Sequence, residues 1–278
     1  MKRKIVRRLP RRLRRILREV YYFIIDIFDS ALGRRDELTP PRRIVFVIGA
    51  GDFRAIGQAF LSYFIRFCRL KPNESVLDVG CGVGRVAVPL TRFLDKDGSY
   101  EGFDIVKTAI DWCNNNISSK FPNFHFQHAD ILNREYNQKG KLDAAKWRFP
   151  YRSGTFDFVF LTSVFTHMLP QAMENYFSEI SRVLKRDGRC LITFFLLNAE
   201  SLALIDQRKS TLDFQYDFGE YRAIDKDVRE SATAYDEQYI RSLYQKHDMV
   251  IMEPVYYGSW CGRQDILGYQ DIIVATKT

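Results

Sequence analysis

The sequence predicts an α/β fold in which helices alternate with the strands of a doubly wound, mostly parallel sheet. The first observation is an apolar, β-prone segment, residues 76–79, that leads into alternating glycines and then into a further apolar stretch. That order is typical of a strand, a tight turn and a helix. The second is that similar apolar runs, among them residues 99–105 and 156–161, recur with helical patterns between them. The third is the length of 278 residues, enough to bury one sizeable core.

The number and spacing of the cysteines limit the kinds of protein that this chain can be. Cys68, Cys81, Cys113, Cys190 and Cys261 are scattered along the chain, and no two of them form a C-x-x-C pair. This pattern argues against a disulfide framework and against a structural zinc site. A reduced, cytoplasmic compartment is therefore expected.

The net charge of +8 belongs almost entirely to the N-terminal segment. Residues 1–43 carry 14 Lys and Arg against 5 Asp and Glu, whereas the rest of the chain carries 28 against 29. Because the body of the protein is close to neutral, a nucleic-acid-binding surface spread over it is not expected. We divide the chain into a basic segment with a linker, residues 1–43, and a main domain, residues 44–278.

The basic segment is predicted to form an amphipathic helix over residues 10–29, because its apolar residues recur at close to helical spacing. Its longest uninterrupted apolar run, residues 20–25, is far short of the roughly 20 residues that span a membrane. The preferred interpretation is a peripheral helix lying on anionic lipid at the inner face of the membrane. Packing on its own domain or on a second subunit, and contact with nucleic acid, are the alternatives.

The glycine-rich turn after the first predicted strand carries the strongest functional signal. Glycine suits a backbone that takes a positive φ or passes close to a ligand, and a following helix N-terminus attracts anionic groups. A dinucleotide site requires G-x-G-x-x-G, but here the third glycine, Gly84, comes one residue early and Arg85 stands where that pattern has glycine. Asp78, just before the turn, suits a ligand that carries a cationic group.

The segment resembles motif I of the class I S-adenosylmethionine-dependent methyltransferases, in which Asp/Glu-x-Gly-x-Gly-x-Gly follows two apolar residues. The resemblance covers roughly residues 53–278. It implies a seven-stranded sheet with helices on both faces and an antiparallel last strand, and S-adenosyl-L-methionine as the cofactor. The cofactor-binding residues that it implies in this motif are Asp78, Gly80, Cys81, Gly82 and Gly84.

Two more acidic positions extend the predicted cofactor site. Asp104 ends the second predicted strand 20 residues after Gly84, where a carboxylate can accept hydrogen bonds from both ribose hydroxyls of a nucleoside. The resemblance implies this role for Asp104, with Ile105 beside it. It also implies that Asp130 meets the adenine amino group and that Ile131 covers the ring.

The segment after the fourth predicted strand, residues 162–168, is expected to face the methyl acceptor, because a doubly wound sheet opens at the carboxyl ends of its strands. Ser163 is a further cofactor-binding candidate there. His167 is the candidate general base for a hydroxyl or amine, since its ordinary pKa is near 6.5; a structural role is the alternative. No metal site is expected, because His125 and His128 would point to opposite faces of a strand.

The remaining segments complete the predicted pattern. Residues 49–51 read as a turn rather than a lid, and residues 185–189 as the turn before the fifth strand. Residues 132–148 either cover the substrate entrance or form a surface excursion, and residues 198–235 are either a substrate cap or an ordinary loop. The other predicted helices are residues 52–70, 83–94, 107–118, 171–184 and 236–247, and the other predicted strands are residues 123–128, 190–197, 249–257 and 269–276.

These observations predict methyl transfer by in-line displacement to a small-molecule, lipid or glycan-type acceptor. No Asn-Pro-Pro-Tyr tetrapeptide follows the fourth strand, which disfavours base or amide N-methylation. The alternative is a non-catalytic methyltransferase-fold scaffold or partner subunit at a membrane surface. Arg85, at the position where the dinucleotide-binding motif has glycine, argues against a dehydrogenase function. Nucleic acid is not expected as a partner, and an oligomer is compatible with the sequence.

Overall fold

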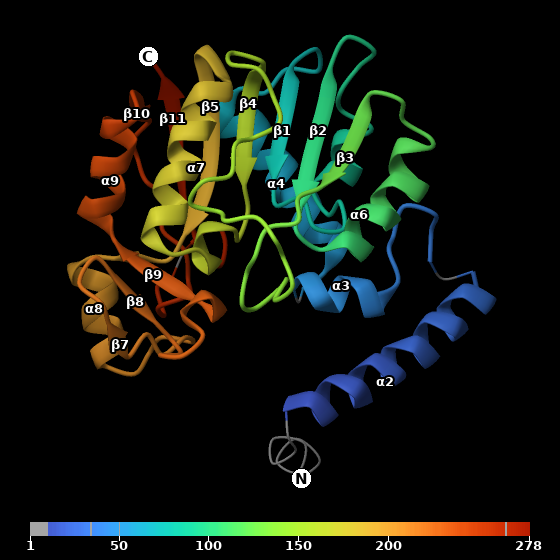
Figure 1. Ribbon diagram of the computed structural model, residues 1–278, viewed down its shortest axis with the longest axis horizontal. Helices are drawn as coiled ribbons and strands as arrows, with labels where there is room; N and C mark the ends of the chain where they lie inside the picture. The colour runs from blue at the N-terminus through green and yellow to red at the C-terminus, as the bar shows by residue number, and fades with distance from the viewer. Residues whose placement is uncertain (1–10, 34, 50, 265) are drawn as a thin grey trace.

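A seven-stranded sheet forms the centre of the computed structural model, which describes residues 11–33, 35–49, 51–264 and 266–278 (Figure 1). The strand order is β10-β11-β5-β4-β1-β2-β3. Strands β1 to β5 are parallel, and β11 runs antiparallel to both of its neighbours. This confirms the predicted fold class. The strands are β1 (Ser75–Val79), β2 (Ser99–Asp104), β3 (Phe124–His128), β4 (Phe156–Leu161), β5 (Leu184–Phe194), β10 (Met249–Ile251) and β11 (Asp271–Lys277).

Helices cover both faces of this sheet because its central strands are apolar on both sides. On β1, Leu77 and Val79 belong to one core and Val76 to the other. The first core is closed by α7 (Pro170–Val183) and α9 (Glu237–Lys246). The second is closed by α4 (Phe53–Cys68), α5 (Ala87–Leu90) and α6 (Lys107–Cys113), which continues as a π-helix, Asn114–Ser118.

The helix after the glycine turn is much shorter than predicted. The sequence suggested a helix over residues 83–94, but α5 contains only Ala87–Leu90 and the flanking residues form turns. Gly84 has a φ of +71°, which is outside the helical region. Pro89 has no amide hydrogen to donate to a longer helix. The glycine turn is therefore followed by one helical turn rather than three.

A second, four-stranded sheet is the main feature that the sequence did not predict. Residues 198–235 hold α8 (Ala199–Asp206) and most of this sheet, where a cap or a loop was expected. Its strands, in order, are β6 (Leu196–Leu197), β9 (Thr233–Asp236), β8 (Tyr221–Ala223) and β7 (Tyr216–Asp217). The fully buried Asp271, first residue of β11, joins the two sheets, because its carboxylate accepts hydrogen bonds from the Leu196 amide and the Trp260 indole, each at 2.7 Å.

The fifth strand also differs from its prediction. A turn at residues 185–189 and a strand at 190–197 were expected, but β5 already begins at Leu184. Leu184 pairs with Phe156 of β4 while Arg189 pairs with Phe158, so the residues between them form a bulge. The predicted turn is therefore an irregularity within one strand.

Helices α2 (Arg11–Ala31) and α3 (Arg42–Ile48) come before α4 in the chain, and α3 lies between α2 and the sheet in Figure 1. They are joined by the carboxylate of Asp26, which accepts hydrogen bonds from the Arg42 and Arg43 amides, and by the rings of Tyr22 and Phe46, which pack at a tilt with their centroids 5.3 Å apart. Among the residues that the structure describes, no helix is long and apolar enough to cross a membrane.

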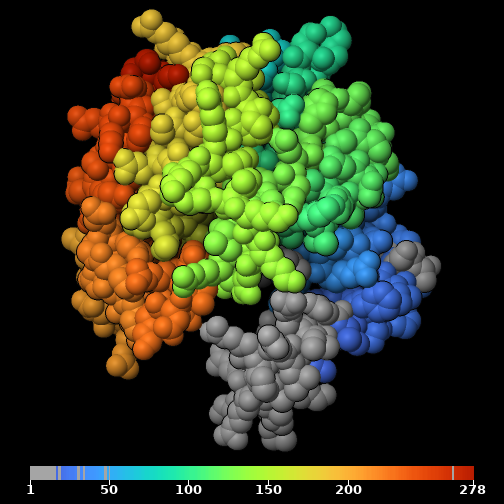
Figure 2. Space-filling model, in the orientation of Figure 1, coloured from blue at the N-terminus to red at the C-terminus, as the bar shows by residue number. Residues whose placement is uncertain are grey.

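Residues 132–148 contain no helix and no strand of either sheet, and are held by isolated bridges such as Ile131 to Leu142. In Figure 2 this part of the chain, drawn in green to yellow-green, lies on the face shown, with the orange surface of the second sheet beside it. Two short 3₁₀ helices, Phe165–His167 and Arg229–Ser231, flank it from the main sheet and the second sheet.

Candidate functional site

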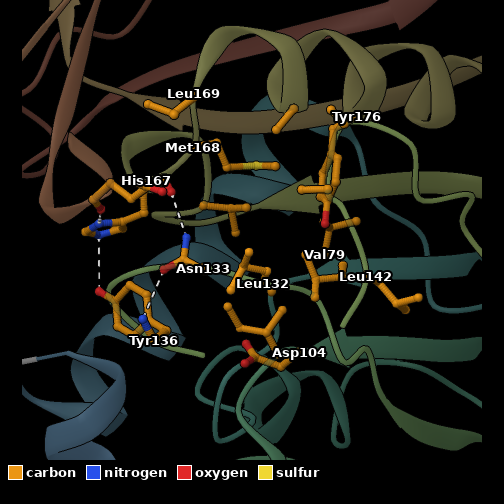
Figure 3. A pocket seen from close by; sticks show the side chains of 18 of the residues that line it. Val79, Asp104, Leu132, Asn133, Tyr136, Leu142, His167, Met168, Leu169 and Tyr176 are labelled. Atoms are coloured by element: carbon orange, nitrogen blue, oxygen red, sulfur yellow. Dashed lines mark hydrogen bonds between the residues drawn. The ribbon is translucent and has the colours of Figure 1, made fainter. Parts of the chain in front are cut away.

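A cavity of about 530 Å³ opens at the carboxyl ends of the central strands (Figure 3). The strand ends contribute Val79 and Gly80 after β1, Asp104 at the end of β2, and Ser163 after β4. Residues 132–145 supply much of the opposite wall, which supports the expectation that this segment covers the entrance to the site. The cavity is therefore formed where a doubly wound sheet places its ligand crevice.

The glycine turn forms one edge of the cavity. Gly80 has a φ of +81°, which a residue with a side chain rarely adopts. A Cβ at this position would lie 2.3 Å from Cγ2 of Val164. Of the motif's three glycines, Gly80 lines the cavity, whereas Gly82 and Gly84 do not, and neither does Cys81. Space and backbone conformation together account for glycine at position 80.

Asp104 is buried at the cavity wall, and its carboxylate is held by the backbone on either side. The amides of Gly82 and Val106 donate to its two oxygens, each at 2.8 Å. Burial raises the pKa of Asp104, and these backbone donors act in the opposite direction. Each oxygen retains acceptor capacity toward the cavity, because a carboxylate oxygen accepts about two hydrogen bonds. The arrangement suits a ligand with adjacent hydroxyl groups.

Asp78 lies behind the glycine turn and does not line the cavity. One oxygen of its carboxyl accepts from the Tyr100 hydroxyl at 2.7 Å, and the other, Oδ1, is buried with no partner among the residues that the structure describes. Burial raises the pKa of Asp78 to about 8, against the lowering effect of the Tyr100 hydrogen bond. A fully buried acid with an unused oxygen is costly to the free protein and is suited to a cationic partner.

We expect Asp78 to make the free protein less stable as the pH rises from about 4 to about 8. The folded state keeps the proton up to about pH 8, whereas an unfolded Asp loses it near pH 4. The folded state therefore binds more protons across this window, and stability falls with pH. The Asp78→Asn variant has no such proton. The melting temperature of the variant minus that of wild type should therefore increase up to about pH 8 and stay constant at higher pH. The same change at the exposed Asp111 is the control, and an unchanged difference between pH 5 and pH 9 contradicts the expectation.

His167 and Tyr136 form a hydrogen-bonded pair at the cavity wall (Figure 3). His167 Nδ1 lies 2.9 Å from the main-chain oxygen of Glu230, and its Nε2 lies 3.3 Å from the Tyr136 hydroxyl. Burial lowers the pKa of His167. Tyr136 was missed by sequence reasoning, because residues 132–148 have no period that would place a side chain, and its aromatic ring was the only signal.

Asn133 joins the segment that carries Tyr136 to the main chain at His167. Its amide nitrogen donates to the His167 carbonyl oxygen at 3.1 Å. Its side-chain oxygen accepts from the amides of Glu135 and Tyr136, each at 3.0 Å, which is an Asx-turn geometry. The Asn133 side chain thus positions Tyr136 and also contacts the backbone of His167.

The structure separates the sequence-predicted residues into two groups. Ser163 has a φ of +61°, and its hydroxyl donates to Gln270 at 2.9 Å. The Asp130 carboxylate accepts from the Asn137 amide at 3.2 Å and does not reach the cavity lining. In the parts of the chain that the structure describes, no group of His, Cys, Asp and Glu could hold a metal ion. The residues that line the cavity are Gly80, Asp104, Ile105, Ile131, Ser163 and His167; those outside it are Asp78, Cys81, Gly82, Gly84 and Asp130.

Comparison with known proteins agrees with this geometry. A family described as a methyltransferase domain matches residues 70–252. Phosphoethanolamine N-methyltransferase 3 of Arabidopsis thaliana is 26% identical over 242 residues, which cover 84% of this chain and 44% of that protein. A sterol 24-C-methyltransferase of Debaryomyces hansenii is 26% identical over 219 residues, 75% of this chain and 52% of that protein. The chain thus spans about half the length of these curated relatives.

Solved structures share the fold. A protein of Pyrococcus horikoshii OT3 superimposes with a TM-score of 0.57 at 18% identity, covering 83% of this chain and 93% of that one. Magnesium protoporphyrin IX methyltransferase of Synechocystis PCC 6803, solved with S-adenosylhomocysteine bound, gives a TM-score of 0.53 at 16% identity. The match covers 92% of this chain and 99% of that one. At these identities the comparison establishes the arrangement of strands and helices, not the acceptor.

Proposed function

The chain belongs to the class I S-adenosylmethionine-dependent methyltransferases, and from this premise we propose that it transfers the cofactor's methyl group to a small-molecule, lipid or glycan-type acceptor. The observation that carries the proposal is that one cavity joins Asp104 and the glycine turn to the wall formed by residues 132–145 and His167. Such a cavity has separate walls for a nucleoside and for a second reactant.

The residues present fit the cofactor of this family. Asp104 would hold the two ribose hydroxyls with the acceptor capacity that its backbone donors leave free. Ile131 would cover the adenine ring from the cavity wall, with Asp130 next to it in the chain. The unpartnered oxygen of Asp78 matches the need of an ammonium group for a buried carboxylate close to the turn, and Gly80 borders the cavity that would hold the ligand chain.

The chain's contribution to the reaction is mainly alignment and exclusion of water. The bound cofactor supplies a sulfonium methyl group, whose displacement leaves a neutral thioether. The protein must hold the acceptor atom in line with that methyl group, and fixed proximity can contribute about 7–11 kcal/mol toward the barrier. Apolar side chains around the cavity, including Leu132, Leu142 and Met168, keep water from competing. A base is needed when the acceptor must lose a proton, and His167 is the candidate.

The nature of the acceptor is inferred from two features. The sterol-methylating and phosphoethanolamine-methylating relatives support a small or lipid-type acceptor. The second feature is the basic helix α2, which exposes large apolar residues to solvent. At least 48% of the surface is accessible in each of Leu17, Val20, Tyr21, Ile24 and Phe28. These residues follow helical spacing and share one face. A lipid, a quinone or a membrane-linked glycan precursor is the acceptor class that a membrane-bound enzyme would meet.

We expect α2 to bind the protein to anionic vesicles. An apolar face next to a cluster of Arg is attracted to anionic lipid, with about 1 kcal/mol for each basic residue near the surface. Deleting residues 1–30, or changing Leu17, Ile24 and Phe28 to Ser in the full chain, should abolish sedimentation with phosphatidylglycerol-containing vesicles and leave cofactor affinity intact. Changing the exposed Val250 to Ser is the control. Equal vesicle binding by the truncated and complete proteins would contradict the membrane proposal.

Titration calorimetry with S-adenosylhomocysteine, followed by transfer from methyl-labelled S-adenosylmethionine into extracted lipids and metabolites, tests the proposed function. Micromolar binding together with a labelled product supports it. Binding without transfer to any fraction favours the alternative, a scaffold with this fold at a membrane surface. Absence of binding to the complete protein, with vesicles present, contradicts the cofactor assignment.

A further inference from the structure

We propose that Tyr136, with His167 behind it, forms a proton relay that accepts the proton of a hydroxyl-bearing methyl acceptor; this rests on the methyl transfer proposed above. Both residues line the cavity, and they come from segments that the sequence leaves unconnected. Tyr136 lies in the irregular segment 132–148, and His167 ends the 3₁₀ helix that follows β4.

The hydrogen bonds around His167 determine its tautomer. The main-chain oxygen of Glu230, 2.9 Å from Nδ1, can only accept, so Nδ1 must carry a hydrogen. In a neutral imidazole the other nitrogen, Nε2, then has a free lone pair and accepts. The Tyr136 hydroxyl, 3.3 Å away, is therefore the donor to Nε2. Both ring nitrogens are occupied, so His167 cannot take a proton from the acceptor directly.

Tyr136 lines the cavity beside His167 and can receive the proton that His167 cannot take directly. Its hydroxyl hydrogen is committed to Nε2, which leaves the oxygen lone pairs to accept a hydrogen bond from a ligand. Burial raises the pKa of Tyr136 to about 12 and lowers that of His167, so the resting pair is a neutral phenol and a neutral imidazole. Asn133 holds this geometry, since it binds both the turn that carries Tyr136 and the main chain of His167.

The step balances with these two residues and the proposed reactants. The acceptor oxygen forms a bond to the methyl carbon as the carbon–sulfur bond breaks and its electron pair stays on sulfur. The acceptor proton passes to the Tyr136 oxygen, and the Tyr136 proton passes to Nε2 of His167. The positive charge of the sulfonium thus ends on the imidazolium, whose Nδ1 hydrogen remains bonded to the Glu230 carbonyl. The imidazolium then releases its proton to solvent.

The relay predicts the kind of atom that is methylated. A neutral amine attacks with a lone pair that it already has, so it needs no base at the moment of transfer. A hydroxyl gains its nucleophilicity by losing a proton, and general-base catalysis of that step contributes about 10²–10⁴-fold to the rate. The inferred acceptor is therefore a molecule with an alcohol or phenol hydroxyl group, and the product is an O-methyl ether.

The first experiment measures the tautomer, which needs no acceptor. Long-range proton–nitrogen spectra of histidine-labelled complete protein are compared with those of His167→Asn, which identifies the His167 signals among the 4 histidines of the chain. The relay requires a protonated Nδ1 and an unprotonated Nε2. It also requires the Nε2 shift to move in Tyr136→Phe while Nδ1 stays protonated. A protonated Nε2 in wild type overturns the relay.

The second experiment measures transfer from methyl-labelled S-adenosylmethionine to the extracted lipid and metabolite fraction, with the product atom assigned by mass spectrometry and NMR. Tyr136→Phe should lower kcat about 100-fold or more. The acceptor KM and the S-adenosylhomocysteine affinity should change by less than about twofold, and adding His167→Asn should cost little more because the pair acts as a unit. The control is Tyr244→Phe, which removes a buried, unpartnered hydroxyl outside the cavity.

The outcomes separate the relay from the proposed function. An O-methyl product whose formation is lost in Tyr136→Phe supports the relay. A labelled N-methyl or C-methyl product, or full activity of Tyr136→Phe, overturns the relay and leaves the methyltransferase proposal in place. No transfer by wild-type protein that still binds S-adenosylhomocysteine overturns both.

Discussion

The Asp104→Ala variant should lose S-adenosylhomocysteine binding by about 100-fold or more. A hydrogen bond to a charged group contributes about 1.5–3 kcal/mol, and each 1.4 kcal/mol is tenfold in affinity. Asp104 would make two such bonds to the ribose. The variant also removes the acceptor for the Gly82 and Val106 amides, so the turn that borders the cavity loses its anchor. Titration calorimetry at neutral pH measures the change.

Loss of binding must be distinguished from loss of fold. Thermal melting of Asp104→Ala should still show a cooperative transition, at a lower temperature than wild type because two backbone donors lose their acceptor. Asp111→Ala is the matched control, since it removes a carboxylate from α6 that is exposed and pairs with Lys107. It should leave affinity unchanged. Wild-type affinity in Asp104→Ala would show that this carboxylate does not hold the ribose.

The second large effect is expected for Gly80→Ala. The added Cβ would lie 2.3 Å from Cγ2 of Val164, and the φ of +81° is unfavourable for alanine. Val164 is a stiff β-branched residue that lines the cavity, so relief of the clash must move either Val164 or the turn into the ligand space. We expect S-adenosylhomocysteine affinity to fall at least about tenfold, because contacts of about 1.4 kcal/mol or more are lost.

Two companion variants separate the causes. Gly154→Ala adds a side chain at a φ of +63° with no heavy atom within 4 Å of the new Cβ, away from the cavity, so it reports the backbone cost alone. It should lower the melting temperature without changing affinity. Val164→Ala combined with Gly80→Ala removes the clashing methyl group and should recover part of the affinity. If Gly80→Ala binds like wild type, the turn does not border the cofactor.

Much of the geometry predicted for the glycine turn and for Asp104 could be read from the sequence, because it depends on residues that are close together in the chain. The positive φ values at Gly80, Gly82 and Gly84 follow from the turn itself. The position of Asp104 follows from the length of one strand and one crossover. The finding that Asp78 and Asp130 do not line the cavity could not be predicted in this way. Where a side chain near the end of a strand lies depends on the neighbouring strands. Whether those two residues contact the cofactor stays a prediction.

The contact between Tyr136 and His167 was not accessible to the same reasoning. Tyr136 and His167 are 31 positions apart, and His167 and Glu230 are 63 apart. No periodicity of residues 132–148 links them, because the segment has no regular helix or strand. The second sheet was missed for a related reason: its strands are two to four residues long, too short to show alternation.

By itself, the sequence determined the succession of strands and helices around the main sheet, the glycine turn and the carboxylate after β2, since these depend on residues close together in the chain. Only the tertiary structure decided that α5 is a single turn, that residues 198–235 build a sheet anchored by Asp271, and that Tyr136 meets His167. Those features arise from packing and hydrogen bonds between segments that are distant in the chain. The energy of such a contact depends on both segments, so neither segment's sequence predicts it alone.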